Sequence, residues 1–488
     1  MSSRGSERRR VAFWSDPWIL GGLSTFIAFR ILYFFLVAST APLLGDEWFY
    51  YPRASLVGTI AHDILSGDVA SGLALVDQLV DRGWFLPGMS IVLAPLRAVT
   101  DSLLLARVYI GVLNGALFLL CVRRLAGMFG IVPARIALAL VAVFPYHAAF
   151  SFRFWGDLLA GHGVLYLLLL LADTQQQIRR NAKADLSRLV VIGTTIVALI
   201  YVRASLTLLM PATLLFLFLF HLERCAVLQA LRRSVAAGVV IVTLVALGLA
   251  PWSYGVSKKF GGLFITTTSL DLNIIYAFGP NTWKPHIVAG QNPWVFIHDL
   301  TAEKAATTGR TYGAALREWR SEVISGLTPR DYAAAVRTNL RLFFINDRDF
   351  LERFASPEFE TRGKARELDF FNQSVIVLNS VLWKAGLPFL VVALLMPWRL
   401  VGPGWWMGLF YRVTFCCIAV QPYLSDSNGR YYVILIPLAA ASVGIAPGAI
   451  NTVTQSDSAM RTNDAMFRFL EWAMPAAIAT ALGAIVVL

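Results

Sequence analysis

Long apolar runs limit what this chain can fold into more than any other feature. Examples are Leu158–Ala172, Val235–Ala250 and Met474–Leu488. About 20 residues of helix cross a bilayer, and a helix satisfies its own backbone hydrogen bonds there. Only 15% of the 488 residues are charged, whereas soluble domains carry about 25%. The sequence therefore predicts an all-α polytopic membrane protein.

The apolar runs predict about eleven transmembrane helices. They lie near residues 17–39, 103–122, 132–149, 157–172, 188–202, 205–221, 234–254, 373–396, 405–421, 431–448 and 466–488. The first run follows the basic residues Arg8, Arg9 and Arg10 and lacks a small-residue cleavage site. We therefore expect it to remain as an anchor.

The segment Leu86–Leu96 decides the topology. Its 11 residues include two prolines, so it is too short for an ordinary span. If it lies at the outer surface, the N-terminus and three short basic regions all face the cytoplasm, as the positive-inside rule requires. If it crossed, those three regions would lie outside. Their basic residues are Arg123, Arg124, Arg135, Arg179, Arg180, Lys183, Arg188, Arg224, Arg232 and Arg233.

This topology divides the chain into three parts. Residues 1–254 form an N-terminal transmembrane module with a first outer loop at 40–102, residues 255–372 form a large outer cap, and residues 373–488 form a C-terminal transmembrane module. We expect a multi-pass protein of the inner (cytoplasmic) membrane with a cytoplasmic N-terminus. Because the basic residues lie in short loops, the net charge of +12 reflects topology rather than nucleic-acid binding.

The cap is expected to be helical and packed on the membrane domain. Thr328 and Pro329 are typical of an N-cap and a first helical position. The apolar residues Tyr332, Val336, Leu340 and Phe343 follow at helical spacing. A second helix is expected from about Ala302 to Ile324.

Two adjacent acids, Asp46 and Glu47, follow the first span and precede the aromatic residues 48–51. They have two readings: solvated carboxylates in an interfacial aromatic belt, or a general base near a membrane-borne substrate. A partly desolvated carboxylate binds its proton more tightly and can deprotonate an acceptor hydroxyl.

Asp157 and Arg203 lie in otherwise apolar surroundings, where an isolated charge is costly. Asp157 either pairs with nearby Arg153 or is a second acid of the site. Arg203 either faces a partner or wet cavity, or occupies a tight outer turn. His147 and His162 are read as packing or interface residues rather than metal ligands.

Arg82 lies shortly before the short segment Leu86–Leu96. Its side chain is expected either to bind a lipid phosphate or simply to extend to the lipid headgroups. Asp426, Arg430 and Tyr431 precede the tenth predicted span. They form either an aromatic interface turn with an internal ion pair or a phosphate or sugar site. All these features fall on the non-cytoplasmic side.

The cysteines predict no disulfide framework and no metal centre. The four are Cys121, Cys225, Cys416 and Cys417. None lies in the longer outer loops, and their spacing is not that of metal ligands.

This pattern resembles the GT-C superfamily of membrane glycosyltransferases, in particular family 39, which contains protein O-mannosyltransferases and lipid A aminoarabinose transferases. The resemblance covers most of residues 17–440. It is carried by the acidic pair 46–47, the Arg82–Pro87 region, Arg107, the turn from Pro145 to Asp157, and Arg430-Tyr431 with Pro437. The family often places Lys directly before Pro, whereas Leu86 intervenes here.

The resemblance implies transfer of a monosaccharide from a polyprenyl-phosphate donor to a glycan, lipid or protein acceptor. It implies Asp46 as the base, with Glu47 orienting substrate or sharing that role, and Arg82, Arg203 and Arg430 holding the departing phosphate. Some superfamily members use a divalent cation, but this sequence shows no ligand set for a metal. Two alternatives remain open: an O-antigen polymerase or ligase, and a lipid or solute transporter.

Overall fold

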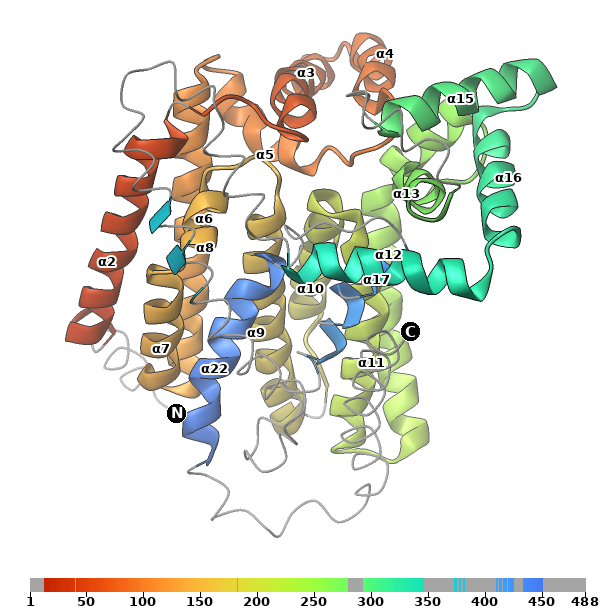
Figure 1. Cartoon of the computed structure of the whole chain (residues 1–488). Coiled ribbons are helices and arrows are strands. Elements are labelled where there is room, and N and C mark those ends of the chain that lie inside the picture. Colours follow the sequence, from red (N-terminus) through yellow and green to blue (C-terminus); the bar gives the residue numbers. More distant parts are fainter. Residues whose placement is uncertain are drawn as a thin grey trace.

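The computed structural model describes residues 13–39, 41–181, 183–279, 293–345 and 433–450, together with short pieces between residues 373 and 424. The described residues form helices, turns and bends, and no strand occurs among them. Upright helices form a bundle, and shorter helices gather at one end of it (Figure 1).

Five helices of the described chain are long and apolar enough to cross a membrane, and a bent pair raises the number to six. The five are α2 (Pro17–Tyr33, continued by a π-helical turn to Ala38), α6 (Leu103–Phe129), α9 (Asp157–Asn181), α11 (Leu209–Leu222, after a 3-10 turn Ala204–Leu208) and α12 (Val227–Phe260). The bent pair is α7 (Ile131–Ala142) and α8 (Pro145–Ser151), which meet at 76°.

These helices fit a multi-pass membrane protein, as the apolar runs predicted. Two shorter apolar helices, α10 (Leu186–Val202) and α22 (Ile436–Ile450), also match predicted spans. The predicted span 466–488 lies outside the described residues, and 373–396 and 405–421 are described only in pieces. The predicted number of about eleven spans therefore stays a prediction.

The segment that decides the topology forms a short helix, α5 (Gly88–Arg97). A helix of ten residues rises about 15 Å, roughly half the thickness of the hydrocarbon core. α5 packs against α3 (Glu47–Leu65), and Ser90 donates a hydrogen bond to the Tyr50 carbonyl at 3.0 Å. Its length agrees with the prediction that Leu86–Leu96 does not cross the bilayer.

The cap contains four described helices. They are α13 (Ser269–Phe278), α15 (Pro293–Thr308), α16 (Tyr312–Ser325) and α17 (Pro329–Ile345). The predicted start of α17 at Pro329 is confirmed, but the single helix from Ala302 to Ile324 is wrong. Gly309 adopts φ +65°, a left-handed conformation that ends a helix readily, and Thr311 then caps α16 by accepting a hydrogen bond from the Ala314 amide.

The N-terminus of α17 gives a testable contribution to stability. The Thr328 hydroxyl accepts a hydrogen bond from the Asp331 amide at 3.2 Å and donates one to the Asp331 carboxylate at 2.5 Å. We expect Thr328→Ala to destabilise the cap by about 1 kcal/mol, seen as faster hydrogen exchange in the first turn of α17. Thr338→Ala, which removes a hydroxyl bonded to the Ala334 carbonyl within the same helix, should leave that exchange unchanged.

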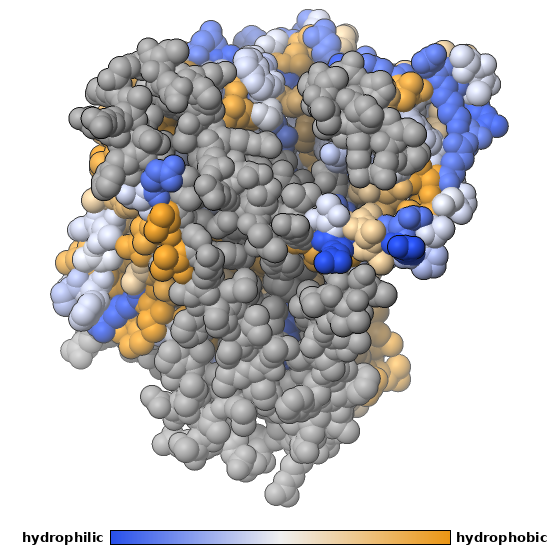
Figure 2. Space-filling model, in the orientation of Figure 1, coloured by the Kyte–Doolittle hydropathy of each residue, from blue (hydrophilic) through white to orange (hydrophobic). Residues whose placement is uncertain are grey.

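The cap is attached to residues 41–102, a stretch that also contains α4 (Val69–Val80). The Thr268 amide donates to the Gly83 carbonyl at 2.9 Å, and its hydroxyl donates to the Arg82 carbonyl at 3.1 Å. Trp84 is buried in the hydrophobic cluster of the cap, and Phe85 stacks on Trp294 of α15. Figure 2 shows hydrophilic residues over the cap and hydrophobic residues on the flank of the bundle below it.

Candidate functional site

Glu47 is the most completely bonded acid of the candidate site. It is fully buried at the start of α3. Its carboxylate pairs with Arg107 and Arg153, each at 3.1 Å, and accepts hydrogen bonds from the amides of Leu44 at 2.9 Å and Phe154 at 3.0 Å. Four donors from three parts of the chain therefore converge on one carboxylate.

The electrostatics of this cluster keep Glu47 ionised. Burial alone would raise the pKa of the Glu47 carboxyl, but the charges of Arg153 and Arg107 and the hydrogen bonds from Arg107 and Phe154 together lower it below its ordinary value. Arg107 also donates to the carbonyls of Ala41, Pro42 and Phe152. A carboxylate held in this way is a poor base, and it ties the 41–47 loop to the turn at 152–157.

The lowered pKa predicts a pH dependence of stability. Because the folded-state pKa of Glu47 lies below the ordinary value of 4.5, its ion pairs contribute fully above that pH and are lost as pH falls through the folded-state value. The difference in unfolding free energy between the wild type and Glu47→Gln should therefore be constant near neutrality and shrink in acid. Denaturant titrations in mixed micelles at a series of pH values measure this, and a difference that does not change with pH would contradict it.

Asp46 occupies a different environment from its neighbour. It lies at the N-cap position of α3 and is half-buried, whereas Glu47 is enclosed. The preceding Gly45 has φ +53° and lies beside the Trp155 ring. The Trp155 indole donates to the Leu44 carbonyl at 2.9 Å. The 41–47 loop and the 152–157 turn therefore lie side by side; the loop carries two acids of the predicted site, Asp46 and Glu47, and the turn carries one, Asp157.

Asp157 and Arg203 form an ion pair. Asp157 is fully buried at the start of α9, and Arg203 follows α10 in an extended conformation. Arg153, the alternative partner of Asp157, is paired with Glu47 instead. Gly156 makes this arrangement possible, because its φ of +80° suits glycine and a side chain there would strike Met89 and Val202.

Arg82 lies at the junction with the cap. Its guanidinium carbon is 4.9 Å from the centroid of the Trp84 ring, and its side chain is half-buried. Burial and then the charge of Arg82 lower the pKa of His298 on α15. The described contacts of Arg82 thus join it to Trp84 and the cap, while Asp157 and Arg203 are held by the bundle.

Three predicted site residues, Asp426, Arg430 and Tyr431, lie outside the described residues. The chain resumes at residue 433 and leads into α22. The Ile434 backbone lies directly against Gly161, one turn after Asp157. α22 also packs along α7.

The described residues include no group of three or more His, Cys, Asp or Glu side chains that could hold a metal ion. His147 and His162 contact each other through their Nε2 atoms at 3.1 Å inside the bundle. Neither is exposed, in keeping with their interpretation as packing residues.

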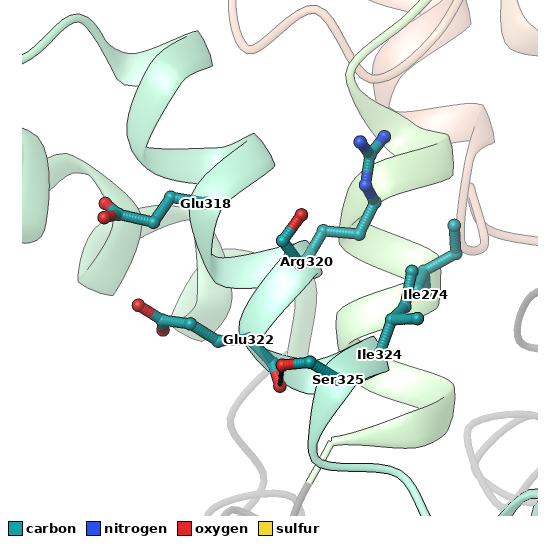
Figure 3. Close-up of a pocket in the computed structure, with 7 residues that line it drawn as sticks. Ile274, Glu318, Arg320, Glu322, Ile324 and Ser325 are labelled. Carbon is teal, nitrogen blue, oxygen red and sulfur yellow. Dashed lines mark hydrogen bonds between the residues drawn. The ribbon is translucent and has the colours of Figure 1, made fainter.

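An open groove of about 670 Å³ lies on the cap between α13 and α16. Figure 3 shows Glu318 and Glu322 pointing to one side of α16 and Arg320 pointing away from them. Arg320 pairs with Asp271 at 2.6 Å. No residue of the predicted site lines this groove, so its size alone does not identify the site.

The sequence did not identify Arg107 and Arg153 as the partners of Glu47. Arg107 was noted only through the family resemblance, and Arg153 only as a partner of Asp157. Arg107 could have been recognised from the sequence as a paired residue, because an arginine near the start of a long apolar helix usually has a nearby partner. Comparisons with known proteins add nothing to this geometry: no family model, curated protein or solved structure matches the chain.

Proposed function

We propose that this chain is a GT-C type glycosyltransferase, which moves a monosaccharide from a polyprenyl-phosphate donor to a glycan, lipid or protein acceptor on the non-cytoplasmic face. One observation supports it most: the loop with Asp46 and the turn with Asp157 are bonded together at one end of an apolar bundle. An acid and an ion-paired arginine beside the membrane suit a lipid-linked substrate with a charged phosphate.

In the proposed reaction, the acceptor hydroxyl oxygen attacks the anomeric carbon of the donor sugar. The bond from that carbon to the phosphate oxygen breaks, and its electron pair leaves with polyprenyl phosphate. Asp46 receives the hydroxyl proton, while Glu47 holds the 41–47 loop through Arg107 and Arg153. The leaving phosphate gains negative charge, so arginines fixed nearby lower the barrier more than they tighten donor binding.

Arg203 is the described arginine best placed for this role, and Arg82 and Arg430 remain further candidates. Arg203 is already paired with Asp157, which limits its orientation before the donor binds. Asp426 and Tyr431 complete the proposed substrate contacts. The same proposal includes the membrane topology. The chain crosses the inner membrane about eleven times, with its N-terminus in the cytoplasm and its site on the non-cytoplasmic face.

The direct test uses the full chain reconstituted in lipid nanodiscs with polyprenyl-phosphate monosaccharides of different sugars. The proposal predicts release of polyprenyl phosphate that depends on both the protein and an acceptor extract. An O-antigen polymerase or ligase would instead require a diphosphate-linked oligosaccharide, and a transporter would move lipid or solute without breaking the sugar–phosphate bond. Either result, with no turnover of monophosphate donors, would reject the proposal.

A further inference from the structure

Arg30 lies within the candidate span α2 and is almost completely buried. One guanidinium nitrogen donates to the carbonyls of Phe26 at 3.0 Å and Ala142 at 3.3 Å. The other donates to the Val141 carbonyl at 3.1 Å. Val141 and Ala142 are the last residues of α7, so Arg30 caps the C-terminus of a helix in a neighbouring segment.

The bend between α7 and α8 explains why an arginine is useful there. A helix that ends inside a bundle leaves its final carbonyls without intrahelical donors. In apolar surroundings each unsatisfied group costs several kcal/mol, and the partial negative charge of the helix C-terminus favours a cation. Arg30 supplies both the donors and the charge at the 76° bend.

A chain of hydrogen bonds continues from Arg30 into two further helices. Arg30 contacts the Nδ1 atom of His147 at 2.6 Å, and the Nε2 atoms of His147 and His162 are 3.1 Å apart. A guanidinium can only donate, so His147 must accept at Nδ1 and carry its proton at Nε2. It then donates to His162 Nε2, which leaves the proton of His162 at Nδ1. Arg30 thereby fixes the tautomer of both histidines.

The two histidines flank the turn that carries the site. His147 lies on α8 before the 152–157 turn, and His162 lies on α9 after it. The Ser151 hydroxyl donates to the His147 carbonyl at 2.8 Å, and the Asn114 amide donates to the Ser151 carbonyl at 3.0 Å. These two bonds hold the residue that precedes the 152–157 turn. Arg153, within the turn, pairs with Glu47.

We propose that Arg30 is a positioning residue for the 152–157 turn, acting through the end of α7 and the His147–His162 contact. It holds Arg153 against Glu47 and Asp157 against Arg203 without touching the substrate. The catalytic consequence rests on the proposed glycosyl transfer, whereas the structural consequence does not.

Cys121 provides a native reporter of this arrangement. Its thiol is buried and donates to the His162 carbonyl at 3.6 Å. The experiment compares Arg30→Met with Arg135→Met in the full-length protein. Arg135 also links α7 to α2, because it pairs with Asp16 at the N-cap of α2, but it does so in the first half of α7, about two turns before the bend. Labelling of Cys121 by N-ethylmaleimide is followed by mass spectrometry well below the unfolding temperature.

We expect Cys121 to be labelled at least about tenfold faster in Arg30→Met, because the region around His162 opens locally. Arg135→Met should label at the wild-type rate, even where its thermal stability is lower. Turnover should fall about 100-fold in Arg30→Met, as expected when reacting groups are displaced by about 1 Å, with little change in KM for the donor. Arg30→Lys, which keeps the charge and three donors, should recover part of that turnover.

The outcomes separate the two claims. Wild-type labelling of Cys121 in Arg30→Met would overturn the positioning role, whether or not the protein transfers sugar. Faster labelling with unchanged turnover per folded molecule would overturn its catalytic consequence. A wild-type protein that turns over no donor would reject the proposed function, while the labelling would still decide whether Arg30 holds the region.

Discussion

Replacing Asp46 with asparagine is expected to lower the turnover number for sugar transfer by roughly 100- to 10,000-fold, the usual contribution of a general base. The amide keeps the size of the side chain but cannot accept the acceptor proton. KM for the donor should change little, because the lost interaction forms mainly in the transition state. Steady-state kinetics in nanodiscs measure both quantities.

Asp63→Asn is the matched control for this variant. Asp63 lies near the C-terminal end of α3, the helix whose N-cap is Asp46. Asp63→Asn removes one carboxylate charge, as Asp46→Asn does. Its turnover should match the wild type. Activity of Asp46→Asn within about twofold of the wild type, far below a general base's contribution, would remove Asp46 from the chemistry.

Replacing Glu47 with glutamine is expected to destabilise the protein by roughly 3–5 kcal/mol, the usual result of breaking a buried ion pair. The glutamine would leave the side chains of Arg107 and Arg153, both almost fully buried, without a compensating negative charge. Glutamine has one acceptor oxygen where glutamate has two, so the bond from the Leu44 amide or the one from the Phe154 amide would also be lost, which loosens the 41–47 loop. Unfolding titrations with sodium dodecyl sulfate in mixed micelles measure the change.

Glu318→Gln is the control for the second prediction. Glu318 pairs with Arg310 at 2.7 Å on the surface of the cap, where both side chains are partly exposed. Such pairs contribute about 0–1 kcal/mol, so this variant should unfold close to the wild type. An equally small effect of Glu47→Gln would show that the buried cluster is not what holds the two acidic segments together.

The bundle could be predicted from sequence because membrane insertion depends on local hydropathy and length. The segments near residues 103–122 and 234–254 each became one long apolar helix, and most of Leu86–Leu96, predicted to be too short for a span, lies in a helix of ten residues. The break between α15 and α16 was missed. Nothing in the apolar pattern marks it, and it depends on the positive φ that Gly309 adopts.

The partners within the site could not be read from sequence in the same way. Asp157 is four residues from Arg153 and 46 from Arg203, yet it pairs with the distant arginine. Sequence distance favours the near pair, but the tertiary packing of α9 against α10 decides the outcome. The sequence thus predicted which residues carry charge in apolar surroundings and left open which charges meet.

Cell-surface glycans provide the decisive test of the proposed sugar transfer. Cells that lack this chain would be compared by mass analysis with the same cells carrying the wild type, Asp46→Asn or Asp63→Asn, at matched protein levels. If the chain transfers sugar, one monosaccharide should be missing from a surface glycan, lipid or protein in the deletion and with Asp46→Asn, and should be restored by the wild type and Asp63→Asn. Unchanged glycans in the deletion, or full restoration by Asp46→Asn, would contradict it.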